Sequence, residues 1–171
     1  MNTKNKSQPA LTTRGKHLLL VDDDPSVREM IGRVLVGEGY HVLTAANGLE
    51  AIDLAATKPL DLVLLDLNMP GKGGWDTFER ISSENPCLAV IIITAKPDQV
   101  FTSIAAGVGA LLEKPLDFTV LLKVVHDLLN EPAEQRLARL AGRGTLLHFH
   151  THTEAGEWIV PVRRGVGERC G

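Results

Sequence analysis

Residues 18–25 read Leu-Leu-Leu-Val-Asp-Asp-Asp-Pro, an apolar run that ends in three carboxylates and a proline. Apolar runs of this length, bounded by turn formers, are typical of strands buried on both faces of a parallel sheet. Sites in such sheets form just beyond the carboxyl ends of the strands. Three other apolar runs also end in a charged or hydroxyl side chain: residues 62–66 (Leu-Val-Leu-Leu-Asp), 91–94 (Ile-Ile-Ile-Thr) and 111–115 (Leu-Leu-Glu-Lys-Pro). We therefore expect these side chains to converge on one pocket suited to a divalent cation and a phosphoryl group.

The composition describes an ordinary globular protein. The chain has 171 residues, of which 44% are hydrophobic and 23% charged, and a net charge of −3 gives no electrostatic reason to expect nucleic acid or a membrane surface as a partner. No apolar run approaches the roughly 20 residues of a membrane helix. Cys87 and Cys170 form no metal-spaced pair, which favours a reducing, cytoplasmic location. Residues 1–15 are polar and are expected to form a flexible extension.

From residue 16 to residue 130 the pattern alternates strand and helix five times, which predicts a parallel sheet covered by helices on both faces. One of the aspartates before Pro25 is placed to cap the first helix, and Asn47 is placed to cap the second. Five strands in this length suit an α/β, flavodoxin-like, doubly wound sheet. The strands are expected at residues 17–21, 40–44, 61–66, 88–93 and 110–112. The inward helix faces are expected to include Val27, Met30, Ile31, Val34 and Leu35 in the first helix, and Ile52, Ala55 and Ala56 in the second.

The four strand ends, taken together and in this order, resemble the receiver domain of two-component response regulators, the CheY-like family, over about residues 16–130. The resemblance supports the strand order 2-1-3-4-5. It implies that Asp22 and Asp23 are the acidic pair that holds Mg²⁺ or Mn²⁺, and that Asp66 is both a metal ligand and the phosphoacceptor. Asn68 would offer its backbone carbonyl to the metal. The residue types fit, because Mg²⁺ prefers hard oxygen ligands.

The resemblance also assigns roles on the fourth and fifth strands. Thr94 and Lys114 are similar to the hydroxyl and the ammonium that contact the phosphoryl oxygens, and the peptide bond before Pro115 is usually cis in this family. Asn68 and Lys96 would tune how fast water removes the phosphoryl group. Leu111 occupies the position where many receivers carry a switch aromatic, so an aromatic flip is not available here.

The function that the resemblance implies is a phosphoacceptor module. A sensor histidine kinase or a histidine phosphotransfer protein would give its phosphoryl group to Asp66, and the charge change would switch a surface that binds a downstream protein. That surface, formed by the fourth helix, fifth strand and fifth helix, also suits a dimer. The protein would catalyse only its own phosphorylation and dephosphorylation.

Two alternatives remain open. Asp22-x-Asp24-x-Ser26 after a strand partly imitates the nucleophile motif of haloacid-dehalogenase-like phosphatases, in which Asp22 would be phosphorylated. That interpretation lacks an acidic pair after Lys114. A degenerate receiver that acts as a scaffold is the other alternative, and the intact acidic and basic residues argue against it.

Residues 131–171 match no effector domain and show no helix-turn-helix pattern, which argues against DNA binding. A helix over residues 133–141 is expected to turn Arg136 and Arg139 to water or a partner, and residues 146–151 and 158–162 are expected to form a β-hairpin. His148, His150 and His152 would share one strand face. They could bind a metal such as zinc, although a plain polar face is the simpler interpretation.

Overall fold

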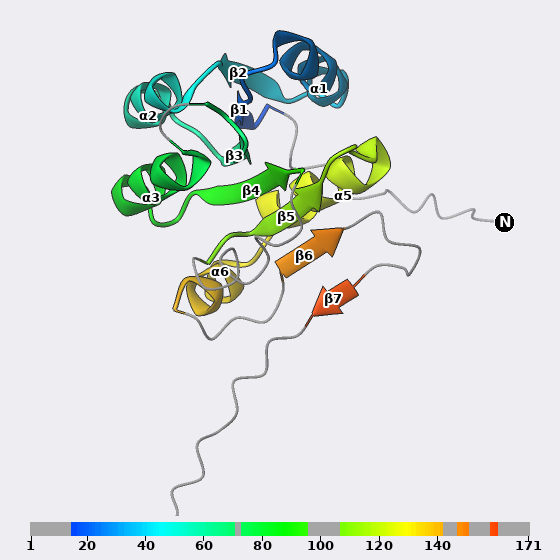
Figure 1. Cartoon of the computed structure of the whole chain (residues 1–171). Coiled ribbons are helices and arrows are strands. Elements are labelled where there is room, and N and C mark those ends of the chain that lie inside the picture. Colours follow the sequence, from blue (N-terminus) through cyan, green and yellow to red (C-terminus); the bar gives the residue numbers. More distant parts are fainter. Residues whose placement is uncertain (1–14, 71–72, 96–106, 142–146, 151–157, 161–171) are drawn as a thin grey trace, which may run out of the picture.

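The computed structural model describes residues 15–70, 73–95, 107–141, 147–150 and 158–160 (Figure 1). Strands and helices alternate along most of this chain, and a further helix and two strands follow. The strands are β1 (His17–Val21), β2 (His41–Ala45), β3 (Leu62–Asp66), β4 (Ala89–Thr94), β5 (Ala110–Glu113), β6 (Leu147–His150) and β7 (Trp158–Val160). The helices are α1 (Pro25–Gly37), α2 (Gly48–Thr57), α3 (Gly74–Glu84), α5 (Phe118–Leu129) and α6 (Ala133–Leu140).

One sheet runs through the molecule in the order β2-β1-β3-β4-β5-β6-β7. The first five strands are parallel, so the predicted order 2-1-3-4-5 is confirmed. The sheet does not stop at five strands, however. β6 pairs in parallel with β5, and β7 pairs antiparallel with β6. The expected hairpin strands are therefore part of the main sheet, while the expected turn between them lies outside the described residues.

Helix starts follow the capping residues of the sequence. The Asp24 carboxylate accepts the backbone N–H groups of Ser26 and Val27 at the start of α1. Asn47 caps α2 by accepting the N–H of Glu50. Such caps satisfy donors that the first helical turn leaves without intrahelical partners. The fourth helix that the sequence predicts falls on residues outside the described part of the chain.

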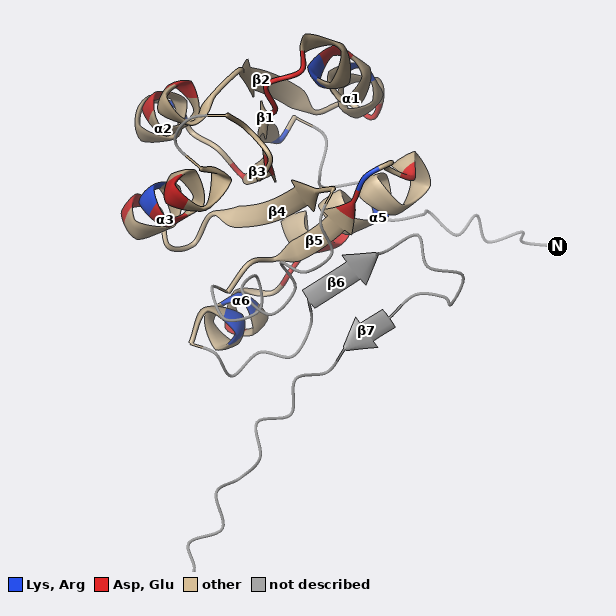
Figure 2. Cartoon of the chain, viewed as in Figure 1, with Lys and Arg blue, Asp and Glu red and all other residues tan. Residues whose placement is uncertain are grey.

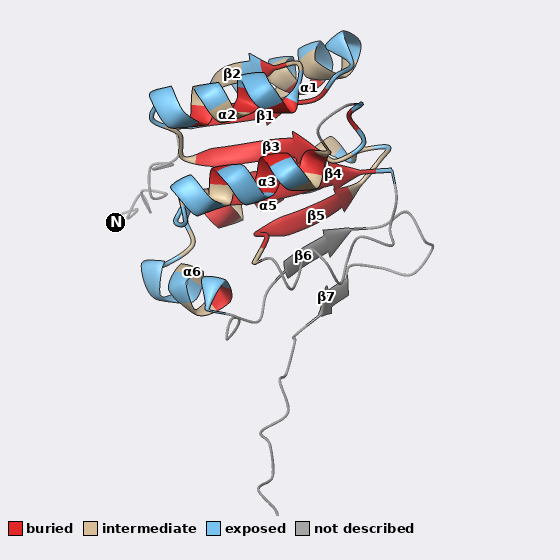
Figure 3. Ribbon diagram, turned by 60° about the vertical axis from the view of Figure 1, so that its left-hand side comes forward, coloured by how far each residue is buried: buried red, intermediate tan, exposed pale blue. Residues whose placement is uncertain are grey.

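The core has one layer on each face of the sheet. α1 and α5 cover one face and α2 and α3 cover the other, while the central strands are buried between them (Figures 1 and 3). Two predicted core positions are wrong: Met30 is 49% exposed, and Ala56 is exposed while Ala51 is fully buried. α2 is rich in small apolar residues, so its spacing alone does not fix which side faces inward. Within the described residues, no helix is both long and apolar enough to cross a membrane.

The start of β1 is tied to the start of β3 by an ion pair. Lys16 Nζ lies 2.8 Å from Asp61 Oδ1, and Asp61 Oδ2 accepts the backbone N–H of His17 at 2.8 Å. Burial opposes ionisation of Asp61, but the hydrogen bonds from Lys16 and His17 outweigh it and lower the pKa of Asp61.

We expect Asp61→Asn to lower the free energy of unfolding at neutral pH by at most about 1 kcal/mol, because the pair is partly exposed. The folded-state pKa is lowered, so the stabilisation is present above the ordinary pKa of 3.8 and is lost as the pH falls through the folded value. Urea unfolding at neutral pH and well below pH 3.8 measures this. Asp53→Asn on the exposed side of α2 is the control. An equal loss at both pH values would contradict the assignment.

Candidate phosphoacceptor site

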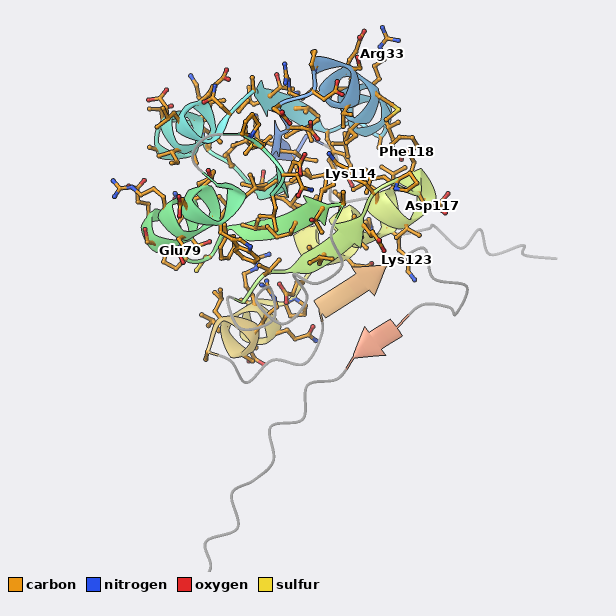
Figure 4. The ribbon with its side chains drawn as sticks, viewed as in Figure 1. Arg33, Glu79, Lys114, Asp117, Phe118 and Lys123 are labelled. Carbon is orange, nitrogen blue, oxygen red and sulfur yellow. The ribbon has the colours of Figure 1, made fainter. Side chains whose placement is uncertain are left out.

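The polar residues that follow the strands meet at the carboxyl ends of the parallel strands, as the sequence predicts. Asp22 and Asp23 follow β1, Asp66 ends β3 and Thr94 ends β4. Lys114 follows β5, at its junction with α5 (Figure 4). Acidic and basic segments at these ends are visible in Figure 2. Parallel pairing of β1, β3, β4 and β5 brings these residues together, because it places all their carboxyl ends on the same side.

Lys114 bridges two of the carboxylates. Its ammonium nitrogen lies 2.9 Å from Asp22 Oδ2 and 2.7 Å from Asp66 Oδ2, and both aspartates are almost fully buried. Burial opposes the charged form of Lys114, but hydrogen bonds and the charges of Asp66 and Asp22 outweigh it and raise the pKa of Lys114. The ammonium therefore stays charged and offsets the repulsion between two buried anions.

The remaining carboxylate oxygens are held by the backbone. Asp22 Oδ1 accepts the N–H of Asp24 at 2.9 Å, and Asp66 Oδ1 accepts the N–H of Asn68 at 2.8 Å. The backbone carbonyl of Asp22 accepts a hydrogen bond from Arg28 at 2.5 Å. Sequence reasoning missed Arg28, since an arginine on the first turn of a helix usually points to water. These contacts fix the two aspartates before any ligand binds.

The carboxylates form a group that fits a divalent cation. One oxygen from each of Asp22, Asp23 and Asp66 lies within 4.8 Å of the others, and this is the group of potential metal ligands found among the described residues. Asp22 and Asp66 are buried, whereas Asp23 is exposed and opens the cluster to solvent. Oxygen-only donors at a partly open position match Mg²⁺, which keeps several of its waters.

Thr94 and Asn68 flank this cluster. The Thr94 side chain is fully buried, and its hydroxyl oxygen accepts a hydrogen bond from the Asn68 side-chain amide at 3.4 Å. The N–H of Lys114 donates to the Thr94 carbonyl at 2.8 Å, so the ends of β4 and β5 are joined. The Lys114–Pro115 peptide bond is cis, as the resemblance implies.

Other predicted positions fall elsewhere. Leu111 is fully buried within β5 and packs in the core on the α2 and α3 side, so an aliphatic side chain fills this position of the strand. Lys96 and His152 lie outside the described residues. His148 and His150 are on β6, opposite Ala110 and Leu112 in register, and the tail metal site stays a prediction.

Gly74 is a site residue that sequence reasoning passed over. A Cβ atom at Gly74 would clash with the Leu67 Cα and would lie 2.9 Å from the Asp66 carbonyl oxygen. The first turn of α3 therefore packs directly on the backbone that carries Asp66. The signal in the sequence was the pair of glycines before the helix, although only Gly74 is needed for this contact, because a Cβ at Gly73 meets nothing within 4 Å.

We expect Gly74→Ala to lower the free energy of unfolding by roughly 2 kcal/mol, because backbone atoms cannot move aside as a flexible side chain can. Gly73→Ala is the matched control and should change it by less than about 0.5 kcal/mol. Urea denaturation of both variants measures the difference. Equal stabilities would show that the loop after β3 adjusts freely.

A family model described as the response regulator receiver domain matches residues 18–126, well over half of the chain. The chain belongs to this family. Its site is thus the acidic pocket of a receiver domain of two-component signalling. The haloacid-dehalogenase alternative loses its support, since the match includes every strand that carries the site.

Curated relatives share the receiver but are much longer. The chain is 39% identical over 120 residues to the transcriptional regulatory protein GlrR of Escherichia coli K12, covering 68% of this chain and 27% of GlrR. It is 35% identical over 122 residues to the DNA-binding transcriptional regulator NtrC of the same organism, covering 70% of this chain and 26% of NtrC. The chain thus matches about a quarter of the length of these relatives.

Solved receivers match the fold over nearly their whole length. A receiver domain protein from Methanospirillum hungatei JF-1 superposes with a TM-score of 0.65 at 28% identity, over 68% of this chain and 95% of that chain. The response regulator TrrA from Thermotoga maritima, solved in complex with Mg²⁺-BeF, gives a TM-score of 0.62 at 33% identity, over 66% of this chain and 98% of TrrA.

Proposed function

We propose that this receiver accepts a phosphoryl group on Asp66 in a reaction that depends on Mg²⁺ or Mn²⁺. The observation that carries the proposal is the Lys114 ammonium held between Asp22 and Asp66, with the Asp23 carboxylate in the same cluster. One cation and three carboxylates leave the pocket net negative. Such a pocket favours the binding of one further cation. A bound cation would then offset the negative charge of an incoming phosphoryl group.

In the proposed reaction a carboxylate oxygen of Asp66 forms a bond to phosphorus while the bond from phosphorus to the donor breaks. The donor is the phosphohistidine of a sensor histidine kinase or of a histidine phosphotransfer protein, and the electron pair leaves with the imidazole nitrogen. Asp66 needs no separate base, because a carboxylate has no proton to lose before it attacks phosphorus. The Lys114 ammonium stays beside Asp66 throughout the reaction and can pair with a phosphoryl oxygen.

The metal would be held by Asp22, Asp23 and Asp66, with the Asn68 carbonyl as a further oxygen. When bound, it neutralises charge on the transferred group. Thr94 lies one hydrogen bond from Asn68, and its hydroxyl can turn to a phosphoryl oxygen of phosphorylated Asp66. That exchange of partners at the end of β4 is the first step by which the charge change reaches the rest of the protein.

The proposal extends to partners and location. The upstream partner is a cytoplasmic sensor kinase or phosphotransfer protein, and the output is contact with another protein rather than with nucleic acid or a membrane. Turnover is limited to phosphorylation and dephosphorylation of the chain itself. Asn68 and Lys96 set how long the acyl phosphate survives. A receiver that acts only as a scaffold would have no need of this intact set of charges.

The direct test is intact-mass measurement after incubation of the full chain with acetyl phosphate. We expect a mass gain of one phosphoryl group with Mg²⁺ present and none when EDTA removes the metal. The physical reason is that the negatively charged donor meets an acidic pocket unless the cation is bound. A gain that is the same with and without EDTA would contradict the metal-dependent mechanism. No gain with Mg²⁺ or Mn²⁺, from acetyl phosphate or a kinase, would favour the scaffold alternative.

A further inference from the structure

The C-terminal part of the chain adds two strands to the receiver sheet on the side of β5. β6 pairs in parallel with β5 in the register Ala110↔His148, Leu111↔Phe149 and Leu112↔His150. β5 would otherwise be the edge of the five-stranded sheet. An edge strand presents unpaired backbone N–H and C=O groups to which another extended segment can add. In this chain its own β6 occupies that position.

α6 lies at the end of the sheet at which β6 must begin if it is to pair in parallel with β5. Because β6 is parallel to β5, it has to begin at the same end of the sheet as β5. Figure 1 shows α6 at that end, beside the starts of β5 and β6. The would-be Cβ of Gly107, just before β5, lies 3.7 Å from the Leu140 Cα at the end of α6. α6 therefore ends beside the start of β5, and residues 142–146, which connect it to β6, lie outside the described residues.

Two arginines fix α6 in this place; the sequence predicts that they face water or a partner, whereas they bind groups of this same chain. Arg139 is 9% exposed and binds Glu131 through two hydrogen bonds, Nε to Oε1 at 3.2 Å and Nη2 to Oε2 at 2.8 Å. Its third guanidinium nitrogen donates to the Gly107 carbonyl at 2.6 Å. Arg136 donates to the carbonyls of Cys87 and Leu128 at 3.1 Å each.

These contacts join α6 to three regions of the chain: the segment before β4, the segment before β5 and the end of α5. Cys87 precedes β4, Gly107 precedes β5, Leu128 is near the end of α5, and Glu131 follows α5. The interaction between a nearly buried arginine and a carboxylate that it binds through two nitrogens is strong and directional. Removing one partner of a buried pair leaves the other charge without compensation. These contacts thus hold α6 beside the starts of β4 and β5.

We infer that Arg139 is a lock that keeps β6 on the β5 edge and so closes that edge to any other strand. The occupant of the edge is the chain's own C-terminal hairpin. A partner, or a second copy, that adds a strand to β5 has to displace β6, and this requires the lock to open. A dimer through the surface that includes β5 therefore competes with the hairpin.

Hydrogen exchange of the full chain, followed by mass spectrometry of peptides, tests this inference without any phosphoryl donor. In Arg139→Met we expect the amides of β6 to exchange roughly tenfold faster than in the wild type, while those of β3 change little. Arg33→Met is the matched control, because it removes an arginine–glutamate pair on α1 in which the Arg33 side chain is 79% exposed.

Two outcomes would overturn the inference. One is faster exchange in α6 with no change in β6, which would show that the hairpin holds itself on β5. The other is exchange of β6 in the wild type at the rate of an unprotected peptide. If Arg139→Met does not fold, Arg139→Lys keeps the charge without the forked geometry. It should give a smaller increase in β6, and no increase would again contradict the lock.

Discussion

Replacing Asp66 with asparagine is expected to abolish phosphoryl incorporation from acetyl phosphate. The amide is nearly the same size as the carboxylate and can still accept the Asn68 N–H, but it is neutral and a poor nucleophile. The fold should therefore survive while the reaction does not. Intact mass after incubation with acetyl phosphate and Mg²⁺ should show full loss of the added phosphoryl group.

Two control variants make this result specific. Asp53→Asn changes an exposed carboxylate on α2 and should leave incorporation unchanged. Asp22→Asn weakens the acidic pair and should slow incorporation without moving it from Asp66. Incorporation that persists in Asp66→Asn and disappears in Asp22→Asn would instead support the phosphatase-like alternative and contradict the receiver mechanism.

Lys114→Met is expected to give the largest loss of stability among the site variants, roughly 3 kcal/mol in the free energy of unfolding without metal. Methionine fills a similar volume but leaves Asp22 and Asp66, both almost fully buried, without the cation between them. Urea unfolding in EDTA measures the loss. Lys58→Met, on the exposed surface after α2, is the matched control and should cost little.

Two further measurements isolate the electrostatic cause. The double variant Lys114→Met, Asp66→Asn should recover part of the loss, because one of the two buried anions is gone. The raised folded-state pKa of Lys114 means that its stabilisation is present below the ordinary pKa of 10.5 and is lost as the pH rises through the folded value. The wild type should therefore lose more stability than Lys114→Met in strong alkali. A double variant no more stable than Lys114→Met would point to lost packing instead.

The sheet and the site could be predicted from the sequence because both depend on local patterns. An apolar run followed by Asp66, or by Thr94, marks a buried strand and its end at once. Parallel topology then forces those ends together, so the convergence of Asp22, Asp66 and Lys114 needs no knowledge of side-chain positions. A charged or hydroxyl side chain at the end of an apolar run was the informative signal.

What could not be predicted depends on contacts between distant residues. An arginine on a short polar helix is usually solvated, and nothing near Arg139 indicates that its partners are Glu131 and the carbonyl of Gly107. The pairing of β6 with β5 could not be predicted for a similar reason: alternation of polar and apolar residues identifies a strand but not its neighbour in the sheet. The buried face of α2 is the one that carries Ala51. Which face points inward depends on the rotation of the helix about its axis, and three or four small apolar residues do not determine that rotation.

The most direct test of the central claim is a crystal structure of the full chain grown with Mg²⁺ and beryllofluoride, which imitates a phosphoryl group. We expect beryllium bonded to an Asp66 carboxylate oxygen, the metal in contact with Asp23 and Asp66, and the Lys114 ammonium beside a fluoride. Beryllium on Asp22 with Asp66 unmodified, or a metal bound away from these carboxylates, would contradict the account.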